Sequence, residues 1–425
     1  MNPLMANDST ASAPLPTGPP VQRSFSTFSS LQYRDYRFLW FGQIARAAAM
    51  WMEQIARQVL ILQLTDSELM LGLVVAARMT PQLLFGLIAG VAADRFDRKR
   101  IIVLAQIATM TFHFITAALV LTDVVQAWHV FALAFATGTS MVFNQTARQS
   151  LIPQLVPEDQ VLNAISLNMA ALNVMRIAGP GLAAFILLGG DVGPVYLTSG
   201  ILGAGVLLCL SMVRIKHVPR QAEEQTSWFD DLRAGLDFVR RRPEVLAVLG
   251  PPMIMFIFGM PYITVFLPLF AKDVLDLGNA GVGALMAATG AGAIAGSLIL
   301  ASQSNLRHRG LLLMAFMATF SVLMIAFSRT TYLPLSILLL MAAASMSTSF
   351  MALTNSLLLQ LSPSDMHGRV VSLMSIARGF VPIGAIAAGA LAASRGAQDA
   401  LLVVAAVCLG LTLLATVAIP PLRRI

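Results

Sequence analysis

Six charged side chains interrupt long apolar stretches of this chain, and they are the residues best suited to chemistry. They are Arg46, Glu53, Arg57, Arg78, Arg176 and Arg378. A charge near the centre of a hydrocarbon layer costs about 3 kcal/mol on insertion scales, so it should face a cavity or a partner. Glu53 is the only acid well inside an apolar stretch, and it precedes Arg57 by four residues, one helical turn. Glu53 is therefore either a proton carrier or the counter-ion of Arg57, and both readings stay open.

The segment that carries Glu53 also carries a polar stripe. Met50, Gln54 and Arg57 recur at i, i+4 and i+7, and such a stripe cannot face lipid cheaply. We expect this segment and the first helix of the second half to line a substrate cavity through Arg46, Met50, Trp51, Gln54, Arg57, Phe258 and Tyr262. The excess of arginine suits an anionic or zwitterionic substrate. Alternatively, these arginines hold backbone carbonyl groups of neighbouring helices. His113 and His129 are further candidate proton carriers.

Composition indicates that membrane-spanning helices position these residues. The chain is 57% hydrophobic and 12% charged, whereas soluble domains are about 25% charged. Apolar segments of about 20 residues span a bilayer as helices, because lipid offers backbone groups no other partner. We predict an all-α membrane protein with twelve spans near 38–63, 69–92, 101–123, 126–147, 162–189, 194–214, 245–270, 280–302, 310–328, 331–358, 370–393 and 400–421.

Lysine and arginine predict the orientation of these spans. If the N-terminus is cytoplasmic, the cytoplasmic segments hold 20 of these residues and the opposite side holds 3. Positive residues favour the cytoplasmic side, so both termini are predicted to be cytoplasmic. The net charge of +7 then reflects topology and does not indicate nucleic-acid binding.

An internal repeat predicts two pseudo-symmetric six-helix bundles. Gly86–Gly90 and Gly292–Gly296 share a Gly-x-Ile-Ala-Gly core, and residues 154–167 resemble residues 360–373 at the same offset of 206. Repeats of this kind serve alternating access to a site between the halves. We expect a disordered cytoplasmic tail at 1–32, bundles at 33–214 and 245–425, and a cytoplasmic linker with an amphipathic helix at 215–244.

The sequence does not contain the motifs expected for disulfide, metal or nucleotide sites. Cys209 and Cys408 lie in apolar spans and give neither a disulfide framework nor a metal-ligand pattern. No phosphate-binding loop of the Gly-x-x-x-x-Gly-Lys-Ser/Thr type occurs. We therefore expect no cofactor, no metal, no direct use of ATP and no enzymatic activity.

The loop after the second span has the features of a latch. Gly86 and Gly90 leave one helix face bare, so a neighbouring helix can approach closely. Asp94 and Arg98 are four residues apart and can pair, and an acid here can also meet the positive end of a helix in the other half. The latch would hold the cytoplasmic side shut in one state. The alternative is a static surface salt bridge worth about 0–1 kcal/mol.

These motifs resemble the major facilitator superfamily of transporters over nearly the whole chain. Gly90, Asp94, Arg95, Arg98 and Lys99 match the superfamily's signature between helices 2 and 3, with Asp97 in place of a glycine. This variant, and a run through the fifth span, are similar to the bacterial drug and siderophore exporter branch that includes the enterobactin exporter. The helix-5 motif comprises Asn168, Asn173, Arg176, Gly179 and Pro180.

The resemblance implies a monomeric, multi-pass transporter of the bacterial inner membrane. Its partners would be membrane lipid, protons and a small amphipathic substrate such as a drug or siderophore, which it would export. The alternatives are an importer or facilitator of a small anionic solute, a flippase for lipids such as lysophospholipids, and a membrane sensor.

Overall fold

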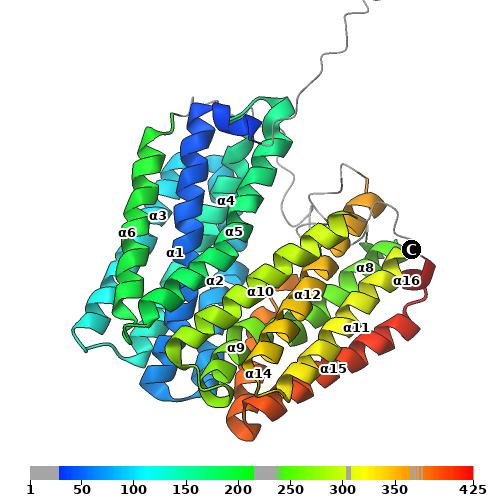
Figure 1. Cartoon of the computed structure of the whole chain (residues 1–425). Coiled ribbons are helices and arrows are strands. Elements are labelled where there is room, and N and C mark those ends of the chain that lie inside the picture. The colour runs from blue at the N-terminus through cyan, green and yellow to red at the C-terminus, as the bar shows by residue number, and fades with distance from the viewer. Residues whose placement is uncertain are drawn as a thin grey trace, which may run out of the picture.

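The computed structural model describes residues 28–214, 237, 239–240, 242–302, 308–363, 366, 370, 373–374 and 377–424. All regular secondary structure in these residues is helical (Figure 1). The first bundle consists of α1 (Arg34–Thr65), α2 (Glu68–Arg95), α3 (Arg98–Leu121), α4 (Ala127–Leu151), α5 (Val161–Leu187) and α6 (Gly193–Met212).

The second bundle begins with a long segment built from several helical pieces. These are α8 (Pro243–Ile254), η4 (Met255–Gly259), η5 (Tyr262–Phe266), α9 (Leu267–Leu269) and η6 (Phe270–Val274). It continues with α10 (Gly278–Ala301), α11 (Arg309–Ser328), α12 (Leu333–Leu361), α14 (Val381–Arg395), α15 (Ala397–Ala418) and α16 (Pro421–Arg424).

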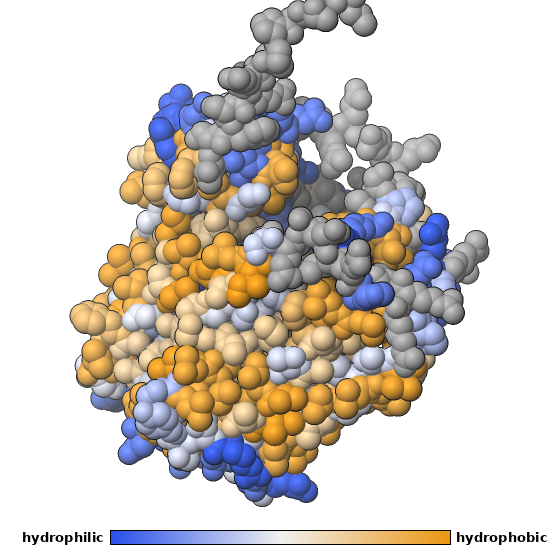
Figure 2. All heavy atoms as spheres, turned by 45° about the vertical axis from the view of Figure 1, so that its right-hand side comes forward, coloured by the Kyte–Doolittle hydropathy of each residue, from blue (hydrophilic) through white to orange (hydrophobic). Residues whose placement is uncertain are grey.

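The helices have the length and composition of membrane spans. Within the described residues, nine helices are long and apolar enough to cross a bilayer, and Val381–Arg395 is a shorter apolar helix. Figure 2 shows a broad apolar band with hydrophilic side chains gathered toward both ends of the molecule. The nine do not include α1, which carries Arg46, Glu53 and Arg57 along its length. These three charged residues therefore lower the apolar character of α1.

The seventh span differs from the uninterrupted helix expected at 245–270. Three π-helical segments, η4, η5 and η6, interrupt it. Pro251, Pro252, Pro261 and Pro268 lie along the same stretch. Proline has no backbone N–H and clashes with the preceding turn, so the ordinary helical ladder cannot continue through these positions. Phe258 and Tyr262 consequently lie in widened turns.

Two contacts join positions that are equivalent in the internal repeat. The Gln58 side-chain amide donates to the Thr264 backbone carbonyl at 3.0 Å, and these residues are 206 positions apart. Lys272 donates to Asp66, again 206 positions away. Two equivalent positions can touch only close to the symmetry axis that relates them. The first and seventh spans therefore meet on the pseudo-twofold axis, at the end of the molecule that carries Asp66.

The same end of the molecule holds the closest packing between the bundles. A Cβ atom on Gly72 of α2 would lie 2.4 Å from the carbonyl oxygen of Ala385 in α14. A Cβ atom on Gly283 of α10 would lie 2.6 Å from the carbonyl oxygen of Pro180 in α5. Only glycine permits such approaches. From this junction the bundles diverge toward the end where α1 begins, as Figure 1 shows.

Most of the tail expected at 1–32 lies outside the described residues, but its last residues are described. Ser29–Gln32 form a 3-10 turn rather than disordered chain. The Ser30 hydroxyl donates to the Asn163 side-chain oxygen at 2.6 Å, which holds this turn against the start of α5. The linker with an amphipathic helix, expected at 215–244, lies largely outside the described residues, because positions 215–236, 238 and 241 are not among them.

We predict that charge reversal at Asp66 loosens the junction of the bundles. In Asp66→Lys, two lysines would face each other across the pseudo-twofold axis, so a cysteine placed in the α2–α14 contact should react faster with a thiol reagent. The double variant Asp66→Lys, Lys272→Asp restores opposite charges and should return labelling to the wild-type rate. Equal labelling of all three proteins would contradict this role.

The same pair has a defined pH dependence. The hydrogen bond and positive charge of Lys272 lower the pKa of Asp66 below its usual value. The stabilisation is therefore complete above the ordinary aspartate range and is lost as the pH falls through the lowered pKa. Labelling of the Asp66→Asn variant should not show this acid dependence.

Candidate functional site

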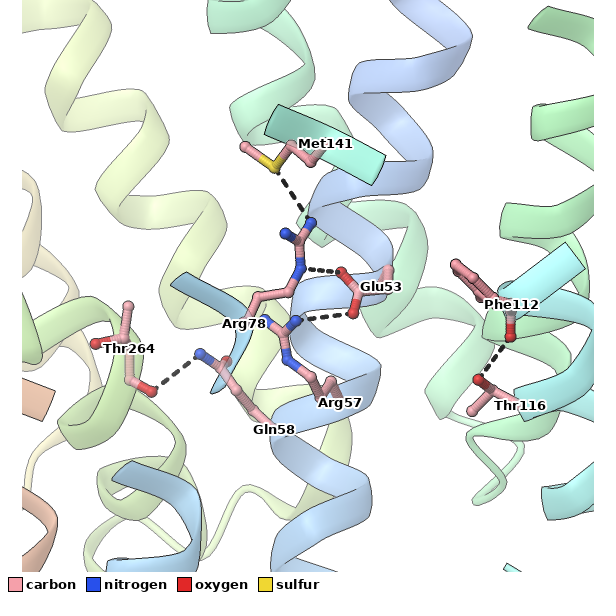
Figure 3. A network of polar contacts seen from close by, with 8 residues as sticks. All are labelled: Glu53, Arg57, Gln58, Arg78, Phe112, Thr116, Met141 and Thr264. Carbon is pink, nitrogen blue, oxygen red and sulfur yellow. Dashed lines mark hydrogen bonds and ion pairs between the residues drawn. The ribbon is translucent and has the colours of Figure 1, made fainter. Parts of the chain in front are cut away.

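Glu53 is buried in the first bundle and contacts two arginines. Its side chain is 4% exposed. The Oε1 atom accepts a hydrogen bond from Nη1 of Arg57 at 2.9 Å, and Oε2 lies 3.9 Å from Nε of Arg78 (Figure 3). The contact with Arg57 follows from their one-turn spacing on α1. Arg78 comes from α2, and sequence spacing gave no signal for this partner.

Arg78 extends the network from α1 to α4. Its Nη2 atom contacts the Met141 sulfur at 3.2 Å, as Figure 3 shows. Its Nε atom makes no hydrogen bond. Arg78 thus reaches from the Glu53 carboxylate on α1 to the sulfur of Met141 on α4, which is a weak acceptor. Its Nε–H group remains available as a hydrogen-bond donor.

A small polar cavity lies beside this network, inside the first bundle. Its volume is about 40 Å³. It is lined by side chains of α1, α2, α3, α4 and α6, namely Arg46, Ala49, Met50, Glu53, Arg78, Gln106, Thr109, His113, Thr137, Met141, Asn144 and Ser199. Arg46 and Met50, expected to line a substrate cavity between the bundles, thus line one within the first bundle. A water needs about 10–15 Å³ on this measure, so the space suits a few waters and not an amphipathic solute.

The two candidate histidines have different roles. His113 is 4% exposed, lines the cavity and packs against Tyr196, with 6.5 Å between ring centroids. Neither of its ring nitrogens makes a hydrogen bond of good geometry, although the backbone of Ser199 lies alongside. His129 instead forms the capping box of α4, where its Nδ1 atom accepts from the Gln126 backbone N–H at 3.0 Å. Only His113 is placed to act with Glu53.

Trp51 lies on the side of α1 that faces α5. The Arg176 guanidinium lies over its ring, 5.9 Å from the centroid. A Cβ atom on Gly179 would lie 2.7 Å from Cβ of Trp51, so this motif glycine lets α5 approach α1 closely. Pro180, the next motif residue, supplies the carbonyl that Gly283 approaches. Asn168 of the same motif is buried and Asn173 is exposed.

The residues from the seventh span join this second group. Tyr262 is buried and packs edge-on against Phe320, with 5.4 Å between centroids, while Phe258 is half-buried. The Arg176 guanidinium also lies within electrostatic range of the Tyr262 hydroxyl group. Trp51, Arg176 and Tyr262 therefore connect α1, α5 and the seventh span across the junction of the bundles. Gln54 is half-buried on α1.

The set of buried arginines differs from the expected one. Arg378, expected inside the eleventh span, is exposed. Arg148, in the last turn of α4, is 3% exposed, and its two Nη atoms make no hydrogen bond. Its Nε atom contacts Asn144 at 3.4 Å, and it interacts electrostatically with Arg46. A residue near a span end gives no signal for this burial, because burial depends on how the bundle packs.

The loop after α2 is held by contacts to backbone groups. Asp97, the residue that departs from the superfamily signature, accepts from the Arg100 backbone N–H at 3.1 Å and so caps α3. Arg98 donates to the Ala93 carbonyl at 3.1 Å, and Lys99 donates to the Val213 carbonyl at 2.6 Å. Arg95 is exposed. The Asp94 side chain lies outside the described part of the structure, so the predicted pair with Arg98 remains a prediction.

The expected close approach at Gly90 is absent from this conformation. A Cβ atom on Gly90 would meet no described atom within 4 Å. This glycine lies near the end of α2, where the bundles diverge. A close neighbour at this position requires a conformation in which the two bundles approach at that end.

Comparison with known proteins agrees with this architecture. The family model described as transmembrane secretion effector matches residues 25–424. The staphyloferrin A transporter of Staphylococcus aureus is 24% identical, with 79% of this chain and 84% of that protein covered. The multidrug efflux pump Tap of Mycolicibacterium fortuitum is 26% identical, covering 91% and 95%.

Solved structures support the same fold. The nucleoside transporter NupG superposes with a TM-score of 0.72 at 13% identity, covering 90% of this chain and 98% of that one. The predicted all-α membrane fold is thereby confirmed. The chain belongs to the transmembrane secretion effector family of major facilitator superfamily transporters.

Proposed function

We propose that this protein is a proton-coupled exporter of small amphipathic molecules, working by alternating access. The observation that carries the proposal is Glu53, an acid buried within a spanning helix and held between Arg57 and Arg78. A buried carboxylate costs several kcal/mol unless it is paired, so a role in the transport cycle accounts for its presence. Similarity to proteins named for drug efflux and siderophore transport supports export of such molecules.

Protonation of Glu53 supplies a physical link between proton binding and helix movement. The charged carboxylate holds Arg57 on its own helix and draws Arg78 from α2 toward α1. Once neutral, it no longer compensates two buried guanidinium groups, and these must find other partners. The α1–α2 contact therefore depends on whether a proton is bound.

Orientation determines which side of the membrane this conformation opens to. We propose that both termini are cytoplasmic, as the lysine and arginine distribution predicts. The junction at Asp66 and Lys272 is then periplasmic, and the bundles diverge toward the cytoplasm. An exporter would load its substrate in this conformation. The group formed by Trp51, Arg176 and Tyr262 would provide aromatic and cationic contacts to that substrate.

A second candidate, import of a small anionic solute, is favoured by one observation. The first bundle buries Arg57 and Arg148 and places Arg46 and Arg78 at its cavity, with Glu53 as the acid beside them. Buried cations need counter-charges, and a solute carboxylate or phosphate is one source.

The two candidates predict opposite coupling. An anionic group that takes Arg78 from Glu53 favours the protonated carboxyl, so solute and proton bind together and travel in the same direction. A solute that requires the charged carboxylate binds when the proton has left, so the two travel in opposite directions. Flux into proteoliposomes under imposed pH gradients of either sign, with a panel of drugs, siderophores and lysolipids, separates these modes.

Glu53→Gln should abolish uphill transport while leaving exchange intact. The amide keeps the shape of the side chain but does not change its protonation state at physiological pH. Substrate exchange without a gradient should stay within a few-fold of wild type, while accumulation driven by a pH gradient disappears. Normal accumulation with normal pH dependence in this variant would assign proton coupling to another residue.

Asp94→Asn should lengthen the time for which the cytoplasmic ends of the two bundles stay apart. If Asp94 and Arg98 latch the cytoplasmic end, loss of the charge disfavours the state in which that end is closed. We would measure thiol labelling at Asn173→Cys, an exposed position on the α5 face that also carries Arg176 and Pro180, with Cys209 and Cys408 changed to Ser. Faster labelling and slower turnover are expected. Unchanged labelling together with normal turnover would argue for a static surface salt bridge.

Trp51→Ala should weaken substrate binding whatever the charge of the substrate. Loss of the ring removes an aromatic surface and the cation–π partner of Arg176, and we expect about a tenfold weaker affinity, or about 1.4 kcal/mol. Trp128→Ala, at the exposed start of α4, is the matched control and should bind normally. Arg57 is unsuitable for a simple alanine test, because its removal would leave Glu53 unpaired, so Arg57→Lys is the variant to compare. Equal affinity of Trp51→Ala and wild type would exclude this surface from the substrate site.

A further inference from the structure

The cavity beside Glu53 contains a second titratable group that the proposed function does not use. His113 reaches it from α3 and Glu53 from α1. The two side chains interact electrostatically, yet in the described contacts no hydrogen bond joins them directly. A group that can carry a proton thus lies near a carboxylate, with the cavity beside both.

The lining of the cavity can hold water between the two groups. Its volume of about 40 Å³ fits about three waters at 10–15 Å³ each. A buried water needs two to four polar partners, and Gln106, Thr109, Thr137, Asn144 and Ser199 supply these around the cavity. Neither ring nitrogen of His113 makes a hydrogen bond of good geometry, although the Ser199 backbone lies alongside, and Nε of Arg78 makes no hydrogen bond. A buried polar group without a partner costs about 1–3 kcal/mol, and water in this cavity would remove that cost.

We propose that His113 relays protons to Glu53 through water held in this cavity, so that the proton route runs inside the first bundle and apart from the substrate site. In the relay, an N–H bond of the imidazolium breaks and its proton passes to a water. That water gives up a proton to the carboxylate of Glu53. The products are a neutral imidazole and a neutral carboxyl group, so charge and atoms balance. The inference rests on the proposed proton coupling.

Helix positions give the relay a direction. His113 lies eight residues before the end of α3 and Glu53 lies twelve residues before the end of α1. At 1.5 Å per residue these are about 12 Å and 18 Å from the end of the molecule that carries Asp66. A proton entering from that end therefore reaches His113 first. Tyr196 packs against the His113 ring from α6, also near that end.

The charged neighbours fit a proton that stops at Glu53. Arg57 and Arg46 come from α1, Arg78 from α2, and Arg148 from α4 interacts with Arg46. These fixed positive charges repel a proton that would pass beyond the carboxylate, while the carboxylate itself attracts it. Among the described residues that line the cavity, Glu53 is the only acid.

The second bundle offers an internal comparison. At the repeat offset of 206, Glu53 corresponds to Gly259 and His113 to Thr319, while Arg78 corresponds to Ala284. None of these three residues can carry a proton. The relay thus belongs to one half of a duplicated fold, which is expected if it was added for coupling rather than required for helix packing.

The relay can be tested without knowledge of the substrate. We would record infrared difference spectra of the reconstituted full-length protein after a rapid drop in pH, and assign the carboxyl band of Glu53 by its loss in Glu53→Gln. His113→Gln should slow the appearance of this band at least tenfold. Thr137→Val, which removes a hydroxyl group from the cavity lining without changing a titratable group, should also slow it. His129→Gln, at the capping box, should match wild type.

Each outcome has a separate meaning. If the Glu53 band appears at the wild-type rate in both His113→Gln and Thr137→Val, the relay is wrong while proton coupling at Glu53 stands. If wild type shows no band that Glu53→Gln removes, Glu53 takes up no proton, and the proposed coupling falls together with the relay. A purely structural role of His113 would slow the band in His113→Gln but leave Thr137→Val at the wild-type rate, and that result would also overturn the relay.

Discussion

The first bundle depends on compensation of buried positive charge by a single carboxylate. Glu53 contacts Arg57 and Arg78 at 2.9 Å and 3.9 Å, in surroundings where unpaired charges cost several kcal/mol. The packing of α1 against α2 is tied to this compensation, and α4 joins it through Met141. The polar cavity beside the network follows from this charge compensation. Polar side chains that surround the charged groups take positions that apolar side chains would otherwise fill.

The two bundles share a fold but differ in the chemistry of their interiors. In the second bundle the interior near the seventh span is aromatic, and the Phe270 and Phe327 rings stack with 4.5 Å between centroids. Tyr262 and Phe320 pack edge-on nearby. Aromatic packing of this kind holds the described interior of the second bundle together. Charge-dependent movement would therefore start in the first bundle, while the second responds through the shared junction.

Sequence reasoning succeeded where the relevant geometry is local or periodic. The pairing of Glu53 with Arg57 follows from one helical turn, and the repeat offset of 206 reappears in two contacts between the bundles. Contacts between helices were not accessible in this way. Arg78 and Arg148 reach their partners only because of how α2 and α4 pack, and no spacing along the chain encodes that packing.

Local signals were also incomplete in two places. The prolines of the seventh span were visible in the sequence, yet an apolar run of that length predicts an unbroken helix, and the observed π turns depend on its surroundings. Gly90 has the residue type for close packing but lies where the bundles diverge in this conformation. A motif that acts in one state of a cycle cannot be judged from the contacts of another.

The ion pair on the pseudo-twofold axis carries information about how the chain arose. Asp66 and Lys272 occupy the same position of the two repeats, and they contact each other. In a symmetric dimer of identical six-helix subunits both copies of this residue would be the same, and two like charges would meet on the axis. An opposite-charge pair at this point became available only after the two copies of the repeat could change independently. The junction of the bundles is thus held by a contact that no ancestor with identical halves could have formed.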